Sequence, residues 1–375
     1  MATISFARGV PAPECLPVEE LADCARAAIE RGGPAVLSYG PAAGYAPLRE
    51  WIGERHGVPA ERIVLTNGSL QGFVFLAEQL TRGKRVLVEA PTYDRPLKIL
   101  RRVGAEVTAL PMDEEGLDPD GLERALRDGS PPAFLYTIPA FQNPSGRTLP
   151  VERRRRVLEL AREHEVLVLE DDPYGLVSFE GEPPPTLHSL AGGEGVVHSS
   201  SFSKTIAPGV RVGWFVLPRD LAEELEAAAV STYISPPFLT QATVLEFLRR
   251  GNFEPNLERV RALLRARRDA MLGALERELG SSARWSRPRG GYFVWLDLPP
   301  ELNTRDLLAR AEAAGVTFVK GEDFFPEGAG GASAARLAFS FVSPEEIEEG
   351  VSRLAGAVAE AADAAGVVVG ASSPA

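Results

Sequence analysis

The sequence predicts an α/β protein whose central sheet is mostly parallel and lies between helices. Two observations carry this prediction. Short, almost wholly apolar runs alternate with longer amphipathic segments through the middle of the chain, and polar clusters follow five of these runs. Strands buried on both faces are almost entirely apolar, and their alternation with helices is typical of a parallel sheet. The length of 375 residues exceeds what one hydrophobic core usually holds, so two domains are expected.

The apolar runs are the expected strands of the central sheet: Arg62–Leu65, Arg85–Val88, Ala133–Thr137, Val166–Leu169, Gly195–Ser199 and Gly213–Leu217. Two amphipathic segments, Leu70–Leu80 and Glu152–His164, are expected to be helices. Ligands bind beyond the carboxyl ends of the strands in such a sheet. The polar clusters found there therefore mark a candidate site: Asn67–Ser69, Pro91–Tyr93, Asn143–Pro144, Asp171–Asp172 and Ser201–Lys204.

The pattern changes after about Asn256, where a smaller α+β domain is expected. Its helices are predicted over Leu257–Leu279, Thr304–Ala314 and Pro344–Glu360, and its strands over Gly290–Asp297, Val316–Val319 and Ala335–Ser340. We assign residues 45–255 to the large domain. Residues 1–44 have too little apolar surface to fold alone, so we join them to 256–375 as the small domain. The small-residue tail from Ala361 is expected to fray.

The amino-acid composition limits which binding partners and which cellular compartment are expected. The chain has 40 basic and 52 acidic residues, a net charge of −12, which argues against nucleic acid or an anionic membrane as partner. Two cysteines cannot form a disulfide framework, which favours the reducing cytoplasm. The four histidines lack ligand spacing, so no metal is expected. Neither a secretory signal nor a membrane-spanning run is seen.

Lys204 is the most informative residue. It is one of only four lysines, and it lies among small hydroxyl residues in Ser199–Trp214, with Arg211 seven positions later. Desolvation and a nearby cation lower the pKa of a lysine, so that its neutral amine can attack a carbonyl. Hydroxyls and a guanidinium also suit a phosphate ester. An aldehyde that carries a phosphate and is held by lysine is pyridoxal 5'-phosphate. The alternative is a lysine that merely begins a helix in a serine-rich loop.

Gly68, Ser69 and Leu70 follow a predicted strand and begin a predicted helix. Free N–H groups at a helix start, together with the helix dipole, form an anion site. This arrangement fits the phosphate of the cofactor. The alternative is that Asn67 or Ser69 only caps the helix.

Asp171 and Tyr174 lie three residues apart after another predicted strand. A carboxylate beside a pyridine nitrogen keeps that nitrogen protonated, and the ring then withdraws electrons best. A tyrosine hydroxyl can stabilise the phenolic oxygen of the same ring. The alternative is an acidic loop with a solvated tyrosine.

Three further residues are candidates for the site. The Asn143 amide can donate to the phenolic oxygen or to a substrate carboxylate, although Asn-Pro-Ser-Gly is also a plain turn. Tyr93 can stack on a flat cofactor, or be an ordinary turn residue. Arg336 lies in an apolar strand pattern, where an arginine must be paired. Its partner is either a substrate α-carboxylate or an internal acidic residue.

In combination, these residues resemble fold type I pyridoxal-phosphate enzymes of the class I/II aminotransferase family. The similarity is greatest to the subgroup with 2-aminoadipate aminotransferase, aromatic aminotransferases and the aminotransferase-like domain of MocR regulators. It extends from Phe6–Pro13 to the strand of Arg336. The ordered motifs are Gly44–Arg49, Thr66–Ser69, Glu89–Tyr93, Gln142–Gly146, Glu170–Tyr174 and Ser201–Lys204.

The resemblance implies a role in cofactor binding for each matching residue. Lys204 would form the internal aldimine and shuttle a proton, and Asp171 would pair with the pyridine nitrogen. Asn143 and Tyr174 would hold the phenolic oxygen, while Tyr93 would stack on the ring. The candidates for the phosphate site are Gly68, Ser69, Leu70, Ser201, Ser203 and Arg211.

The resemblance also implies a substrate site and a homodimer. Arg336 would take the substrate carboxylate with help from Asn143, and Gly9 would lie in the substrate site. Tyr39 matches a tyrosine that reaches the phosphate of the neighbouring subunit, which implies two shared active sites. The expected partners are therefore a small amino acid, a 2-oxo acid and a second copy of the chain.

Two departures from the family concern the choice of substrate. Aminoadipate-type relatives usually carry a helical segment before the Phe-Ala-x-Gly motif, which this sequence reaches within a few residues. Leu70 stands where a polar residue is frequent. The function expected is aminotransfer from an α-amino acid to a 2-oxo acid. The alternatives are a lyase, decarboxylase or oxidase acting on amino-acid-derived substrates, or a non-enzymatic domain that senses the cofactor.

Overall fold

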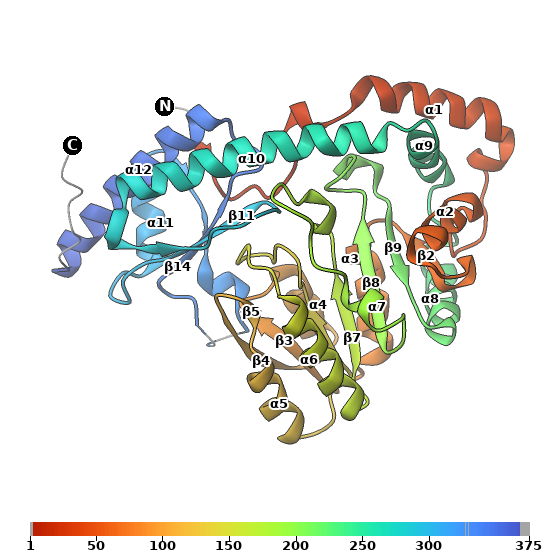
Figure 1. Ribbon diagram of the computed structural model, residues 1–375, viewed down its shortest axis with the longest axis horizontal. Helices are drawn as coiled ribbons and strands as arrows, with labels where there is room; N and C mark the ends of the chain where they lie inside the picture. The colour runs from red at the N-terminus through yellow and green to blue at the C-terminus, as the bar shows by residue number, and fades with distance from the viewer. Residues whose placement is uncertain (1–2, 327, 329, 368–375) are drawn as a thin grey trace.

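The computed structural model describes residues 3–326, 328 and 330–367 of the chain. Its main feature is a sheet with the strand order β2-β9-β8-β7-β6-β3-β4-β5 (Figure 1). Pairs that involve β9 or β5 are antiparallel and the others are parallel, which confirms the predicted class. The strands are β2 (Ile63–Thr66), β3 (Arg85–Ala90), β4 (Glu106–Asp113), β5 (Gly116–Leu117), β6 (Phe134–Thr137), β7 (Leu167–Asp171), β8 (Val196–Ser201) and β9 (Gly213–Val216).

Helices cover both faces of this sheet. Successive side chains of a strand point to opposite faces, so neighbouring residues of one strand pack against different helices. Val86 and Val88 pack into one apolar cluster with α3, α4 and α8. Leu87, between them, packs into another cluster with α5, α6 and α7. The helices are α3 (Ser69–Leu80), α4 (Asp94–Arg102), α5 (Pro119–Arg127), α6 (Val151–Glu163), α7 (Leu187–Leu190) and α8 (Arg219–Tyr233).

A second, four-stranded sheet lies beside the large one, with the order β10-β11-β14-β13 (Figure 1). The 26-residue helix α10 (Phe253–Glu278) runs along the molecule from α9 to α12. The other elements of this part are β10 (Arg284–Trp285), β11 (Phe293–Asp297), β13 (Val319–Lys320), β14 (Ala334–Ala338), α11 (Thr304–Ala313) and α12 (Pro344–Ala365).

The N-terminal segment contacts both parts of the molecule. Strand β1 (Ile4–Ser5) pairs with β12 (Val316–Thr317). Helix α1 (Val18–Gly32) instead packs along α9 (Phe238–Arg249), which also contacts α2 (Ala46–His56) (Figure 1). The start of the segment thus lies where the assignment to the small domain expects it, whereas α1 lies beside helices of the range 45–255. The domain bounds themselves stay a prediction.

Two sequence expectations need correction, and two strands at one side of the large sheet were missed. Strand β4 was not predicted because it is largely exposed and lacks an apolar run, and β5 has only two residues. The run Val316–Val319 is two short strands in different sheets, since β12 pairs with β1 and β13 with β14. The expected fraying from Ala361 is wrong as far as Ala365, to which α12 continues. Residues 368–375 of that tail lie outside the described residues.

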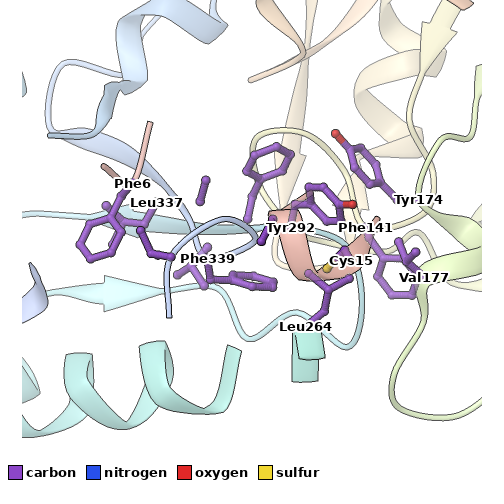
Figure 2. Packing of buried hydrophobic residues seen from close by; sticks show 14 of the residues in the cluster. Phe6, Cys15, Phe141, Tyr174, Val177, Leu264, Tyr292, Leu337 and Phe339 are labelled. Carbon is purple, nitrogen blue, oxygen red and sulfur yellow. The ribbon is translucent and has the colours of Figure 1, made fainter. Parts of the chain in front are cut away.

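One apolar cluster joins the two sheets and supports the site between them. It brings together Phe6 of the N-terminal segment, Phe141, Tyr174, Leu264 of α10 and Leu337 of β14 (Figure 2). All five are nearly or fully buried. Because Phe141 and Tyr174 belong to the loops that follow β6 and β7, the same core that holds the small sheet also positions those loops.

Within the described ranges, no helix is long and apolar enough to cross a membrane. The same residues contain no group of three or more histidine, cysteine or acidic side chains that could hold a metal ion.

Replacing Gly213 with alanine is expected to destabilise the fold and the start of α3. A Cβ atom at this position of β9 would lie 2.2 Å from the backbone nitrogen of Ser69. Backbone atoms cannot yield as a flexible side chain can, so we expect a loss of about 1–3 kcal/mol in the free energy of unfolding. Gly209→Ala is the control, because nothing lies within 4 Å of its added carbon. Thermal and denaturant unfolding that is equal for both variants would contradict the expectation.

Candidate active site

A cavity of about 480 Å³ lies beyond the carboxyl ends of β2, β3, β6, β7 and β8 and extends to the small sheet. The sequence candidates that line it are Gly9, Gly68, Ser69, Leu70, Tyr93, Asn143, Asp171, Tyr174, Ser201, Ser203, Lys204, Arg211 and Arg336. Tyr39 does not line it and is 79% exposed. The structure thus brings together every candidate except the one expected to act in a neighbouring subunit.

Lys204 presents a partly buried amine to this cavity. Its Nζ donates to the Gly9 carbonyl at 2.8 Å and lies 4.9 Å from the centre of the Tyr292 ring. Burial lowers the pKa of Lys204 to about 8, and the positive charges of Arg336 and Arg211 contribute to the same shift. A considerable fraction of the amine is therefore neutral and nucleophilic in slightly alkaline solution.

Asp171 is a partly buried carboxylate that accepts two hydrogen bonds. Tyr136 Oη donates to Oδ2 at 2.8 Å, and Ser199 Oγ donates to Oδ1 at 3.3 Å. Burial raises the pKa of Asp171 to about 6. No basic side chain forms an ion pair with it among the described residues. A cation placed beside this carboxylate would be strongly favoured, and a protonated pyridine nitrogen is such a cation.

Helix α3 begins at Ser69 without a side-chain cap, so the capping alternative for Asn67 and Ser69 finds no support. The first N–H groups of a helix have no partner within the helix. Arg211 extends to the same place, where its Nη2 donates to the Asn67 carbonyl at 2.9 Å. Gly68, at φ 85°, leaves room for that guanidinium, because a Cβ would lie 2.1 Å from Arg211 Nη2. The arrangement suits a phosphate group.

Arg336 lies in β14 with its side chain buried. Its Nη1 donates to Asn143 Oδ1 at 3.1 Å and its Nη2 donates to the Ala7 carbonyl at 2.8 Å. Its buried Nε has no hydrogen-bond partner among the residues that the structure describes. Across the described part of the chain no acidic residue forms an ion pair with Arg336, so the internal salt bridge considered above is not found. A guanidinium with unused donors can bind a carboxylate.

Two tyrosines face the cavity as protonated side chains. Burial raises the pKa of Tyr93 to about 12, and it raises the pKa of Tyr174 far above its usual value. The ring of Tyr174 packs against those of Tyr292 and Phe293, at centroid distances of 5.5 and 5.8 Å. Packing on this side fixes the ring, so its hydroxyl is available as a donor in the cavity.

Sequence reasoning missed several residues of the site. Tyr136 could have been found, because a tyrosine within a buried strand needs a partner for its hydroxyl. The Ala7 carbonyl that accepts from Arg336 leaves no trace in residue type, since any residue carries a carbonyl. Gly9 was a candidate for the substrate site, but the hydrogen bond from Lys204 to its carbonyl was not expected. Phe293, which lines the cavity, was read only as part of a strand.

These residues fit pyridoxal phosphate: a partly buried lysine amine, a carboxylate without an ion pair among the described residues, and an open helix start face one cavity. Together with the two-sheet fold, they define a pyridoxal-phosphate enzyme of fold type I.

The comparisons with known proteins agree with this class. Residues 14–354 match the family described as aminotransferase class I and II. The chain is 41% identical to 2-aminoadipate transaminase of Thermus thermophilus, covering 94% of this chain and 89% of that one. It is 35% identical to aromatic-amino-acid aminotransferase 1 of Thermococcus litoralis, covering 95% and 88%.

A solved structure is similar along nearly the whole chain. It is the alpha-aminoadipate aminotransferase from Thermus thermophilus, complexed with N-(5'-phosphopyridoxyl)-L-leucine. The TM-score is 0.92 at 39% identity, with 96% of this chain and 93% of that one covered. The chain belongs to the class I and II aminotransferase family, and it is a pyridoxal-phosphate-dependent aminotransferase.

Removing the hydroxyl of Tyr136 is expected to weaken cofactor binding. In Tyr136→Phe the carboxylate of Asp171 loses a buried donor, so its pKa rises further and less of it is charged to pair with a pyridinium. A hydrogen bond to a charged group contributes about 1.5–3 kcal/mol, so we expect the cofactor dissociation constant to rise at least about tenfold. Tyr233→Phe is the control, because the Tyr233 hydroxyl has no partner. Equal cofactor affinities in fluorescence titrations of the two variants would refute this role of Tyr136.

Proposed function

We propose that this chain moves an α-amino group from an amino acid to a 2-oxo acid, with Lys204 as the residue that holds the cofactor. One observation carries the proposal: the Lys204 amine, the Asp171 carboxylate and the Arg336 guanidinium open to the same cavity. Transamination requires three groups in one place: an amine, an electron-withdrawing ring held by a carboxylate, and a cation that binds the substrate carboxylate.

Bound pyridoxal phosphate supplies a ring that withdraws electrons from the substrate nitrogen and so stabilises negative charge on the substrate Cα. Lys204 Nζ then takes the proton from that Cα. Its lowered pKa, about 8, lies close enough to neutral pH for the amine both to accept and to release a proton. Lys204 is therefore the general base and acid of the proposed reaction.

The other residues of the cavity bind and orient the cofactor. Asp171 keeps its negative charge beside the ring nitrogen, while Tyr174 and the amide of Asn143 donate to the phenolic oxygen. Tyr93 stacks on the ring. The residues proposed for the phosphate are Gly68, Ser69, Leu70, Ser201, Ser203 and Arg211. For Leu70 only the backbone N–H can serve, since its side chain is apolar.

Arg336 binds the α-carboxylate of the donor and later that of the oxo acid, next to Asn143 and the Gly9 segment. One cavity that takes two acids in turn implies a ping-pong order, in which the first product leaves before the second substrate enters. The two relatives are named for 2-aminoadipate and for aromatic amino acids, so acidic and aromatic side chains form the first panel of donors to test.

The holo-protein is expected to pass through a complete spectral cycle. An accepted amino donor added alone should remove the absorbance of the lysine-bound cofactor, and an oxo acid should restore it. Lys204→Ala should abolish the cycle while Lys98→Ala, on the exposed face of α4, retains it. Steady release of ammonia or carbon dioxide from the amino acid without an oxo acid would contradict transamination and favour the lyase, decarboxylase or oxidase alternative. Absence of any spectral response would favour a cofactor-sensing domain.

We further propose that the protein is a cytoplasmic homodimer with shared active sites. Large apolar side chains are exposed around Tyr39: Leu37, Val230 and Ile234. The Gly40 N–H donates to Ser235 Oγ at 3.3 Å, which brings the two segments that carry these side chains together. A contiguous exposed apolar surface of this kind suits a second copy. Tyr39 would then extend to the phosphate of the neighbouring site.

Tyr39→Phe is expected to weaken cofactor binding without dissociating the dimer. Loss of a hydroxyl donor to phosphate should raise the cofactor dissociation constant about tenfold or more. Tyr45→Phe is the matched control, because its ring packs on Phe238 inside the same subunit. Light scattering measures the mass and cofactor titration measures the affinity. A monomeric mass, or an unchanged affinity for Tyr39→Phe, would contradict the shared site.

A further inference from the structure

The guanidinium of Arg336 lies close to two aromatic rings. Its Cζ is 4.4 Å from the centre of the Phe293 ring and 4.9 Å from that of Phe324. Phe293 comes from β11, beside the strand of Arg336, and Phe324 ends the 3-10 helix η7 (Gly321–Phe324). Both phenylalanines are 1% exposed. Rings at these distances attract a cation, and the attraction grows when water is excluded.

Both the hydrogen bonds and the rings restrain the guanidinium. The bonds to Asn143 Oδ1 and the Ala7 carbonyl fix two points on its edge. The rings of Phe293 and Phe324 add van der Waals and cation–π contacts to these two fixed points. A guanidinium held in this way still has N–H donors that these two bonds do not use, and a pair of neighbouring donors can bind a carboxylate bidentately.

We propose that Phe293 and Phe324 are positioning residues that keep Arg336 aligned for the carboxylates of both substrates. The inference rests on the proposed function, because it takes Arg336 as the residue that binds the carboxylate. The rings themselves need not touch the reacting atoms. Their contribution is to exclude water from the cation and to hold the guanidinium in one position. Little conformational freedom of the Arg336 side chain is then lost when a carboxylate binds.

The backbone of Phe324 makes a second contact, in which its ring takes no part. The Thr92 N–H donates to the Phe324 carbonyl at 2.8 Å, so η7 also holds the loop that carries Tyr93. A substitution that changes only the ring leaves this hydrogen bond possible. The effect of the ring on Arg336 can therefore be measured without removing the backbone tie to Tyr93.

A purely structural role for the Phe324 ring is the competing explanation. Phe324 belongs to a small apolar cluster with Trp295 and Ala334, and its ring lies 6.0 Å from that of Trp295. Phe325 provides a matched control in the same cluster. Its ring lies 6.4 Å from that of Trp295, and among the described residues it forms no cation–π contact with Arg336. Loss of either ring costs packing, but only Phe324 faces the guanidinium.

The test compares Phe324→Leu with Phe325→Leu in the holo-protein. In Phe324→Leu we expect KM to rise on the order of tenfold for both the amino acid and the oxo acid, with kcat changed less than about twofold. The affinity for a non-reactive monocarboxylate such as propionate, measured by calorimetry, should fall by the same factor. Binding of an amine that lacks a carboxylate should not change. Phe325→Leu should match the wild type in all these measurements, even if its melting temperature falls.

Arg336→Met separates failure of this inference from failure of the proposed function. If Arg336→Met binds propionate as the wild type does, Arg336 is not the carboxylate site, and both its proposed role in substrate binding and the positioning role of the two rings are overturned. If Arg336→Met loses propionate binding but Phe324→Leu behaves like Phe325→Leu, only the positioning role is overturned. A loss in Phe324→Leu that extends equally to the amine would also overturn it, because a general distortion of the cavity would then be the cause.

Discussion

The arrangement of the site depends on holding three ionisable groups in one cavity, where each is at least partly shielded from water. Desolvation lowers the pKa of Lys204 to about 8 and raises that of Asp171 to about 6. Arg336 is buried with an unpaired Nε. Shielding charges from water costs free energy unless they are paired. Such a cavity therefore does not stabilise the fold by itself, but it favours the binding of ligands that carry the opposite charges. A phosphate, a pyridinium and a substrate carboxylate would supply the missing partners.

The N-terminal segment connects the fold to these charges. The Ala7 carbonyl accepts from Arg336, and the Gly9 carbonyl accepts from Lys204. The segment is held in place from both ends: the Ala338 N–H donates to the Phe6 carbonyl at 2.7 Å, and Ser340 Oγ donates to the Val10 carbonyl at 2.9 Å. Small-sheet residues thereby fix a stretch of chain that contacts the lysine of the large sheet. Any shift between the two sheets would be felt at Lys204.

The sequence predicted the parts of this arrangement that depend on residue type. Lysine, aspartate and arginine in apolar surroundings were recognisable as site residues. The apolar strands predicted the sheet, and the site lies beyond the carboxyl ends of those strands. Contacts made by backbone carbonyls, and by the ring of Phe324, were not predictable, because they depend on the tertiary approach of distant segments. The strand β4 was missed since it is too exposed to form an apolar run. The position of α1 against α9 likewise follows from tertiary packing that periodicity cannot reveal.

The most direct test of the account is the pH dependence of acetylation at Lys204 in the cofactor-free protein, followed by mass spectrometry of the peptide that contains it. The account predicts a midpoint near pH 8 and an upward shift in Arg336→Met, because a cation that opposes the charged amine is removed. Arg95→Met, which removes an exposed guanidinium at the cavity, should leave the midpoint in place. A Lys204 midpoint near the ordinary lysine value of about 10.4 would contradict the claim that burial and neighbouring cations keep this amine reactive.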